Sequence, residues 1–162
     1  MSLKELIVEL TSISGPAGSE SAVAERVSEL LRPLVDEVNT DNLGNVIGYK
    51  SCGKAPAKKL LIDAHIDEIG LIVTGIEEGF LKFSTIGGVD PMILPARQVK
   101  ILTDPPIYGV IGCMPVHALT PAEMNKATKA EDMYIDIGLS QEEAAKKVPL
   151  GTPIVIETPV AS

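Results

Sequence analysis

The sequence of 162 residues contains no tryptophan, and its other aromatic residues are three tyrosines and two phenylalanines. Proteins that bind single-stranded nucleic acid stack bases on such side chains, so this scarcity disfavours a base-stacking surface. Positive charge is lacking as well, because 14 Lys and Arg stand against 22 Asp and Glu, for a net charge of −8. Nucleic acids and anionic membranes both require a positive surface, and we expect neither as a partner.

Cysteines and long apolar runs are also scarce. The only two cysteines, Cys52 and Cys113, form no C-x-x-C pair and are too few for a disulfide framework, which favours a reducing, cytoplasmic setting. No stretch approaches 18 uninterrupted apolar residues, and the residues after Met1 do not form the apolar core of a signal peptide. The G-x-S-x-G, P-loop and G-x-G-x-x-G motifs are absent, so the corresponding chemistries have no support.

The first part of the chain mixes helical and strand patterns. Ser2 and Glu5 form a capping-box spacing before a short amphipathic helix, and Ser19 is placed to cap a second helix. Turn residues at 41–44 predict a hairpin between two short strands. An apolar strand is predicted to open at 60–62 and to run on through 63–67.

From residue 69 onward the pattern is one of short strands separated by Pro and Gly. One helix is predicted over 141–147, and strands are predicted over 69–76, 80–86, 98–103, 107–111, 133–137 and 153–157. This spacing predicts a small barrel or sandwich. The expected fold is therefore an α/β segment over residues 1–68 followed by a β-rich module over 69–157.

His65 is the most promising residue for chemistry. Asp63, His65 and Asp67 alternate, so an extended backbone would place all three on one face. An imidazole beside a carboxylate suits a metal site, because one ring nitrogen binds the ion while the carboxylate holds the other N–H. The alternative is an exposed strand end with solvated acids, and spacing alone favours it because a lone H-x-D is a weak pattern.

Other candidates have less support. A catalytic zinc takes about three protein ligands, and Cys113 and His117 are the remaining choices, although no spacing ties them to His65. For His117 a loop position is the favoured interpretation. The carboxylate pair Glu77-Glu78 lies in a predicted hairpin turn rather than across a cleft, which disfavours glycoside hydrolysis.

The segment His65-Ile66-Asp67-Glu68-Ile69-Gly70 resembles the H-x-D-E-[IV]-G motif of the tetrahedral (TET) metallo-aminopeptidases, the family of glutamyl and deblocking aminopeptidases. Further elements of the family follow in order along nearly the whole chain. They are D-x-L-G-N at 41–45, I-G-G-x-D-P at 86–91, L-P at 94–95, G-V-I-G at 109–112, P-x-H at 115–117 and E-D-x-x-I-D-I-G at 131–138. The H-x-D-E-I-G element is moderately specific, and the ordered set is highly specific.

The resemblance implies a metal-dependent exopeptidase that removes N-terminal residues from peptides with two zinc or cobalt ions. It implies that residues 1–68 are the first part of an α/β catalytic domain, and that 69–157 are a β-barrel-like dimerisation domain inserted into it. Residues 158–162 would begin the return to the catalytic domain. It also implies that His65 binds one metal, that Asp67 is the carboxylate that orients His65, and that the chain self-associates through the β domain.

The family's remaining metal ligands and its general-base Glu follow the inserted domain, and residues 1–162 contain no counterpart of them. We therefore expect a truncated enzyme that holds at most one weak metal site and is inactive alone. The alternative is a stand-alone dimerising interaction module with a vestigial metal site. Glycan hydrolysis, a third possibility, is disfavoured by the absence of Trp.

Overall fold

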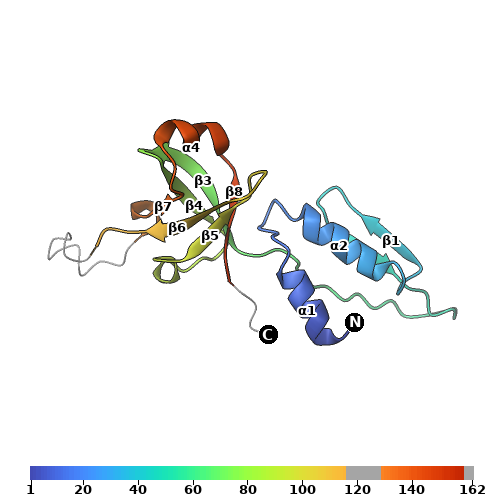
Figure 1. Cartoon of the computed structure of the whole chain (residues 1–162). Helices are drawn as coiled ribbons and strands as arrows, with labels where there is room; N and C mark the ends of the chain where they lie inside the picture. Colours follow the sequence, from blue (N-terminus) through green and yellow to red (C-terminus); the bar gives the residue numbers. More distant parts are fainter. Residues whose placement is uncertain (116–128, 159–162) are drawn as a thin grey trace. The chain divides into compact units, whose positions relative to one another are not determined.

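The computed structural model describes residues 1–115 and 129–158 (Figure 1). The chain forms two compact units, of which the first is Met1–Glu68 and the second begins at Ile69. The candidate residue His117 and all but the first residue of the predicted return segment 158–162 lie outside the described residues. None of the helices in the described ranges is long and apolar enough to cross a lipid bilayer.

The first unit begins with helix α1 (Leu3–Thr11), which starts at the predicted capping box. The Ser2 hydroxyl accepts a hydrogen bond from the Glu5 backbone N–H at 3.2 Å, and the Glu5 carboxylate accepts one from the Ser2 N–H at 2.6 Å. The backbone bond and then the side-chain bond to Ser2 hold the pKa of Glu5 below its ordinary value. The capping box predicted at Ser2 and Glu5 is therefore confirmed.

Helix α2 (Ser21–Leu31) corrects the predicted cap, because its N-cap residue is Glu20 and not Ser19. The Ser19 N–H donates to the Pro16 carbonyl at 2.8 Å, so Ser19 belongs to a turn that precedes the helix. The Glu20 carboxylate accepts from the Gly18 N–H at 2.7 Å and does not cap α2. Helix α2 therefore starts without a side-chain cap.

The predicted hairpin is present as β1 (Glu37–Thr40) and β2 (Val46–Tyr49), which pair antiparallel. The turn depends on Asp41, whose carboxylate accepts the backbone N–H groups of Leu43 at 2.9 Å and Asn45 at 3.0 Å. The Asn45 side chain contributes most to lowering the pKa of Asp41, followed by the Asn45 backbone N–H.

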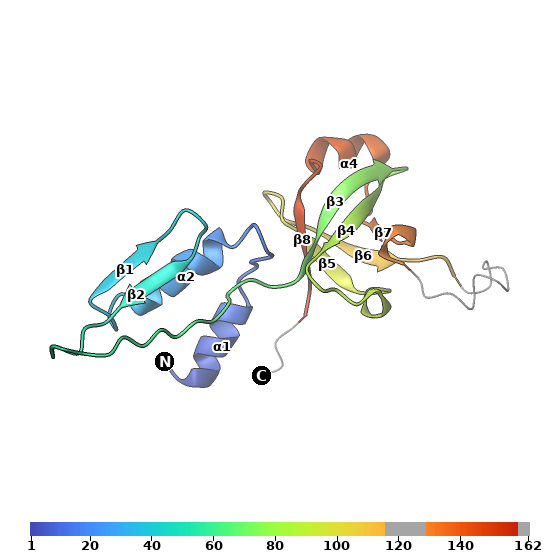
Figure 2. The same ribbon diagram turned by 180° about the vertical axis from the view of Figure 1, so that it is seen from behind.

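The strand predicted at 60–67 does not form among the described residues. The chain between β2 and β3 runs as a trace without a strand (Figure 2), and Leu60, Leu61 and Ile62 are 86%, 87% and 85% exposed. Three consecutive apolar residues are typical of a strand that is covered on both faces of a sheet. A strand needs a neighbour for its backbone groups, and residues 1–115 and 129–158 supply none to this segment.

The second unit is a closed barrel of six antiparallel strands in the order β3-β4-β7-β6-β5-β8, which decides between the predicted barrel and sandwich. The strands are β3 (Gly70–Glu77), β4 (Phe80–Ile86), β5 (Gln98–Ile101), β6 (Ile107–Gly112), β7 (Tyr134–Asp136) and β8 (Pro153–Ile156). The short 3-10 helices η1 (Pro91–Ile93) and η3 (Ala130–Asp132) lie in the connections. Closure occurs where β3 pairs with β8, with Leu71 opposite Ile154.

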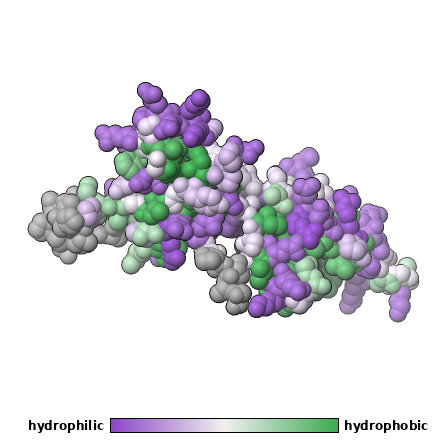
Figure 3. Space-filling view, viewed as in Figure 1, coloured by the Kyte–Doolittle hydropathy of each residue, from purple (hydrophilic) through white to green (hydrophobic). Residues whose placement is uncertain are grey.

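The barrel interior holds the main hydrophobic core of the described residues. Side chains that alternate along the strands point inward, and helix α4 (Gln141–Lys147) adds Ala144. Fully buried members include Leu71, Leu81, Leu94, Val99, Ile101, Ile111, Met133, Ile135 and Ile154. Figure 3 shows hydrophobic residues of this unit between hydrophilic ones at the surface.

The turn between β3 and β4 consists of Glu78 and Gly79, both with positive φ, at 53° and 90°. Gln141 of α4 binds this hairpin twice, accepting the Gly79 N–H at 2.9 Å and donating to the Ile76 carbonyl at 3.3 Å. A Cβ atom on Gly79 would lie 2.4 Å from the Leu139 carbonyl oxygen. The turn therefore requires glycine at this position, for its φ and for the close approach of the chain before α4.

Candidate functional site

His65 lies in the first unit, between the unpaired segment at 60–64 and the start of β3. Its Nδ1 atom is 3.1 Å from the Asp67 carbonyl oxygen and 3.1 Å from Asp67 Oδ1. A carbonyl and an ionised carboxylate carry no hydrogen, so the hydrogen in these contacts belongs to Nδ1. This tautomer leaves a lone pair on Nε2, and the side chain of His65 is 86% exposed.

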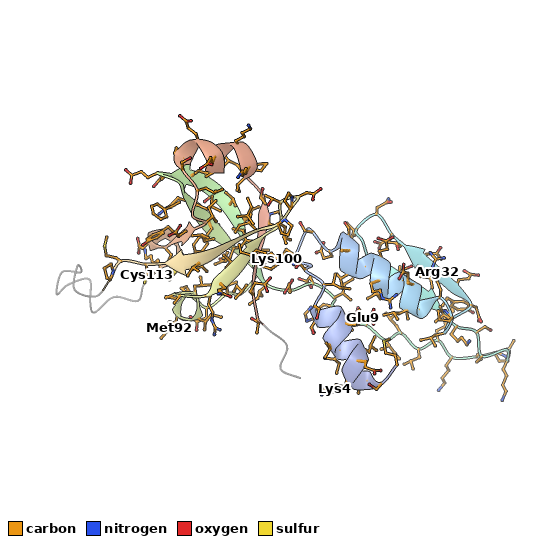
Figure 4. All side chains as sticks on the ribbon, viewed as in Figure 1. Lys4, Glu9, Arg32, Met92, Lys100 and Cys113 are labelled. Atoms are coloured by element: carbon orange, nitrogen blue, oxygen red, sulfur yellow. The ribbon has the colours of Figure 1, made fainter. Side chains whose placement is uncertain are left out.

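This donor set fits a metal ion in part. A neutral imidazole whose N–H is held by a carboxylate is the arrangement in which histidine binds metals. Asp63 does not complete a site, because the described residues contain no group of three or more His, Cys, Asp or Glu able to hold an ion. Cys113 (Figure 4) lies in the barrel unit and is partly buried. Residues 1–115 and 129–158 therefore offer one coordinating position rather than a complete catalytic site.

Glu68 fixes the chain immediately after this position. Its backbone N–H donates to the Gly15 carbonyl at 3.0 Å, and its own carbonyl accepts from the Ala17 N–H at 3.3 Å. Its carboxylate accepts from the Gly15 N–H, with 2.9 Å between the Gly15 nitrogen and Oε1. The sequence pattern missed this contact, since residues 11–18 are rich in Ser, Gly and Pro and contain no sign of a partner distant in sequence. The signal available was the acidic residue that follows the H-x-D element.

A hollow of about 280 Å³ lies beside His65 in the first unit. Side chains from α1, α2 and the loop between them make it largely apolar, and the segment from His65 to Glu68 also lines it. Its apolar lining includes Leu10, Ile13, Val23 and Val27. The exposed imidazole therefore belongs to a recess of this unit.

An ion pair joins the two helices that line this hollow. Arg26 of α2 donates through Nε to Glu9 of α1, which is labelled in Figure 4. Arg26 also pairs with Glu29 at 2.6 Å. The hydrogen bond to Glu9 and then the one to Glu29 raise the pKa of Arg26 above its ordinary value, so the guanidinium stays charged.

This chain is similar to known peptidases in sequence and in structure. The model of the M42 glutamyl aminopeptidase family matches residues 44–162. The solved structure of a TET aminopeptidase from a marine-sediment thaumarchaeote is 38% identical and superposes with a TM-score of 0.87, covering 96% of this chain and 44% of that one. The TET1 peptidase of Pyrococcus horikoshii, which can assemble into a tetrahedron or a large octahedral shell, is 33% identical, with a TM-score of 0.79 over 96% of this chain and 47% of that one.

A third solved structure that is similar to this chain is named an endoglucanase rather than a peptidase. The endoglucanase of Thermotoga maritima is 36% identical and superposes with a TM-score of 0.77, covering 93% of this chain and 44% of that one. The chain spans about two fifths of the length of three curated relatives that it matches. The similarity therefore extends over nearly all of this chain and over less than half of each relative.

Proposed function

Because the chain belongs to the M42 glutamyl aminopeptidase family, we propose that it supplies part of the catalytic domain of a metal-dependent aminopeptidase. The reaction is the hydrolysis of the first peptide bond, which releases N-terminal residues from peptides. The observation that carries the proposal is the imidazole of His65, which Asp67 holds in the tautomer that leaves Nε2 free to bind a metal.

The roles of the two residues follow from their contact. His65 would bind one metal through Nε2, and Asp67 would orient the ring by accepting the Nδ1–H. In the complete enzyme two divalent ions, zinc or cobalt, supply Lewis-acid activation of water. The described residues provide one imidazole for this centre, and the chain covers 44% of the thaumarchaeal TET aminopeptidase, so we propose that the other ligands and the general base belong to the part of the enzyme that this chain does not cover.

We assign the two compact units to separate roles. Residues 1–68 would be the first part of the α/β catalytic domain, residues 69–157 a dimerisation domain inserted into it, and residues 158–162 the return to it. The exposed apolar run at 60–62 supports the first assignment, because further strands of a larger sheet would cover it.

Self-association of the barrel unit has support on its own surface. Tyr108 and Val110 alternate with the buried residues Gly109 and Ile111 of β6 and are 60% and 44% exposed. An apolar outer face on a strand is typical of an interface between subunits.

The described cysteines are free, which supports a reducing, cytoplasmic location.

The proposal is tested with two proteins. The chain of residues 1–162 alone, given Zn²⁺ or Co²⁺, is expected not to cleave aminoacyl-p-nitroanilides. A chimera that joins residues 1–162 to the remaining part of the thaumarchaeal TET aminopeptidase is expected to cleave them, and its H65A variant is not. A D63N variant is the control for surface charge and is expected to remain active. Full activity of the H65A chimera would contradict the role of His65.

The alternative from a different class is an interaction module that dimerises and has no catalytic partner segment. An open reading frame that continues beyond codon 162 with an Asp-rich strand end and a Glu-Glu pair would support the peptidase. A native stop codon at that point would support the module. EDTA-sensitive turnover by the 162-residue chain alone would contradict both interpretations.

A further inference from the structure

Glu68 joins the candidate metal-binding segment to the turn between α1 and α2. The Glu68 backbone and the Gly15–Ala17 turn exchange two hydrogen bonds and form a short parallel bridge at Pro16. The Glu68 carboxylate adds a third bond, from the Gly15 N–H at 2.9 Å, in a partly buried position. A carboxylate that accepts a backbone N–H makes a charge-assisted bond, which is stronger than a neutral one.

The turn that receives Glu68 is itself held firmly. Pro16 is fully buried. A Cβ atom on Gly15 would lie 2.8 Å from Cγ1 of Val23, a residue of α2 that is 4% exposed. The backbone of Gly15 thus lies directly against the buried side of α2. A continuous set of contacts runs from this helix through Gly15 to Glu68.

The same contacts extend to the imidazole through the next residue. Asp67 precedes Glu68 directly and holds the His65 Nδ1–H with both its carbonyl oxygen and its carboxylate. Both acceptors depend on the backbone position of Asp67. Fixing Glu68 on the Gly15–Ala17 turn restricts that position, although His65 itself is 86% exposed and has few packing contacts to orient it.

We infer that Glu68 is a positioning residue for His65, acting through the hydrogen bond that its carboxylate accepts from Gly15. This inference rests on the proposed function, because it concerns the nitrogen that His65 would offer to a metal. The required property is an acceptor at the end of a side chain of this length. A glutamine in place of Glu68 would keep a carbonyl oxygen as acceptor, whereas a methionine has a similar length and offers only a weakly accepting sulfur. The E68Q and E68M variants are therefore a matched pair.

The experiment measures the tautomer of His65 in the 162-residue chain by long-range ¹H–¹⁵N NMR. An H117Q background removes the second of the two histidines. The spectra are recorded in a slightly alkaline buffer, so that the two neutral tautomers are compared. We expect the Nδ1–H form to dominate in the parent and in E68Q. In E68M its ratio to the Nε2–H form is expected to fall about fivefold, the change that corresponds to one net hydrogen bond.

Two further measurements keep the outcome decisive. Amide exchange at Gly15 is expected to be faster in E68M than in E68Q. E68D shortens the side chain by one methylene group, so it is expected to resemble E68M and replaces it if E68M unfolds the first unit. An unchanged tautomer ratio in E68M and E68D would overturn the inference, and so would an E68Q ratio as low as that of E68M.

The activity of the chimera separates this inference from the proposed function. The H65A chimera is expected to be inactive. If the H65A chimera stays fully active while E68M still alters the tautomer ratio in the 162-residue chain, the metal-binding role is wrong and the positioning contact is supported. If H65A abolishes the activity of the chimera while E68M leaves the tautomer ratio unchanged, the inference about Glu68 is wrong and the proposed function is supported.

Discussion

Leu81 and Leu61 differ in exposure, so their replacement by alanine is expected to change the free energy of unfolding by different amounts. Leu81 in β4 is 0% exposed inside the barrel, whereas Leu61 is 87% exposed in the unpaired segment. Removing a buried leucine side chain loses its transfer free energy and leaves a cavity, so L81A is expected to lower the free energy of unfolding of the barrel by about 2–5 kcal/mol. Full burial of a leucine is worth roughly 2 kcal/mol, and about one eighth of Leu61 is covered, so L61A is expected to cost about 0.3 kcal/mol.

The assay is urea denaturation of the 162-residue chain, followed by backbone amide resonances of each unit because the chain has no Trp. The first unit reports on L61A and the barrel reports on L81A. A loss below about 1 kcal/mol for L81A would refute the packing argument for the barrel. A loss above about 1 kcal/mol for L61A would show that residues 60–62 are covered in solution.

The same pair of variants tests the proposal that further strands cover this segment. In a longer protein that contains those strands, Leu61 would be buried on a sheet face. L61A is then expected to cost about 2–5 kcal/mol, as L81A does. A cost that stays near zero in such a protein would contradict the assignment of residues 60–67 to a central strand.

The remaining predictions concern the barrel unit. G79A is expected to lower the melting temperature much more than G138A. Both glycines have positive φ, which costs a residue with a side chain about 1 kcal/mol of strain. Of the two, only Gly79 is so placed that a Cβ atom would meet a carbonyl oxygen, that of Leu139. Equal decreases in melting temperature for G79A and G138A would contradict this reasoning. The side-chain and then the backbone hydrogen bond of Ser140 lower the pKa of Glu143. That stabilisation is present above the ordinary carboxyl pKa and is lost as the pH falls through the lowered value, so E143Q is expected to flatten the acid limb of the melting temperature against pH. Size-exclusion chromatography is expected to show a species larger than the 17.1 kDa monomer, and a strict monomer would argue against a dimerisation role.

Local signals in the sequence predicted much of the fold. The pair Ser2 and Glu5 defined the start of α1, and the alternating residues of 80–86 defined β4 with its observed bounds. The α4 bounds also agree, because Ser140 and Glu143 form a second capping box. Each of these elements depends on contacts between residues close in sequence, which is the information that a local pattern carries.

The incorrect predictions concern elements whose structure depends on contacts with residues distant in sequence. Ser19 is predicted to cap α2, but it lies in the turn that starts at Pro16, one residue before the N-cap Glu20, and Glu68 holds the adjacent Gly15 from a distant part of the sequence. The strand predicted at 60–67 fails for the related reason that strand formation depends on a neighbour that local sequence does not specify. The resemblance to the TET family, rather than the spacing, implied the contact between His65 and Asp67, and the structure contains it.

The membership of the chain in the M42 family was also recognised from its ordered motifs, and the family match confirms it. The roles of His65 and Asp67 stay predictions. Glu68 belongs to the H-x-D-E-[IV]-G motif, but the sequence assigns it no role. Its partner Gly15 lies in a loop whose position against Val23 only the three-dimensional arrangement reveals.

The pairing of the first and last barrel strands has a consequence for how such a unit can be shared among proteins. Leu71 in β3 lies opposite Ile154 in antiparallel β8, so the chain enters and leaves the barrel at points about one strand spacing, or ~5 Å, apart. A gap of that size can be bridged by a tight turn. A host protein can therefore gain, lose or exchange the whole barrel as if it were one surface loop, without rearranging the strands on either side of the junction.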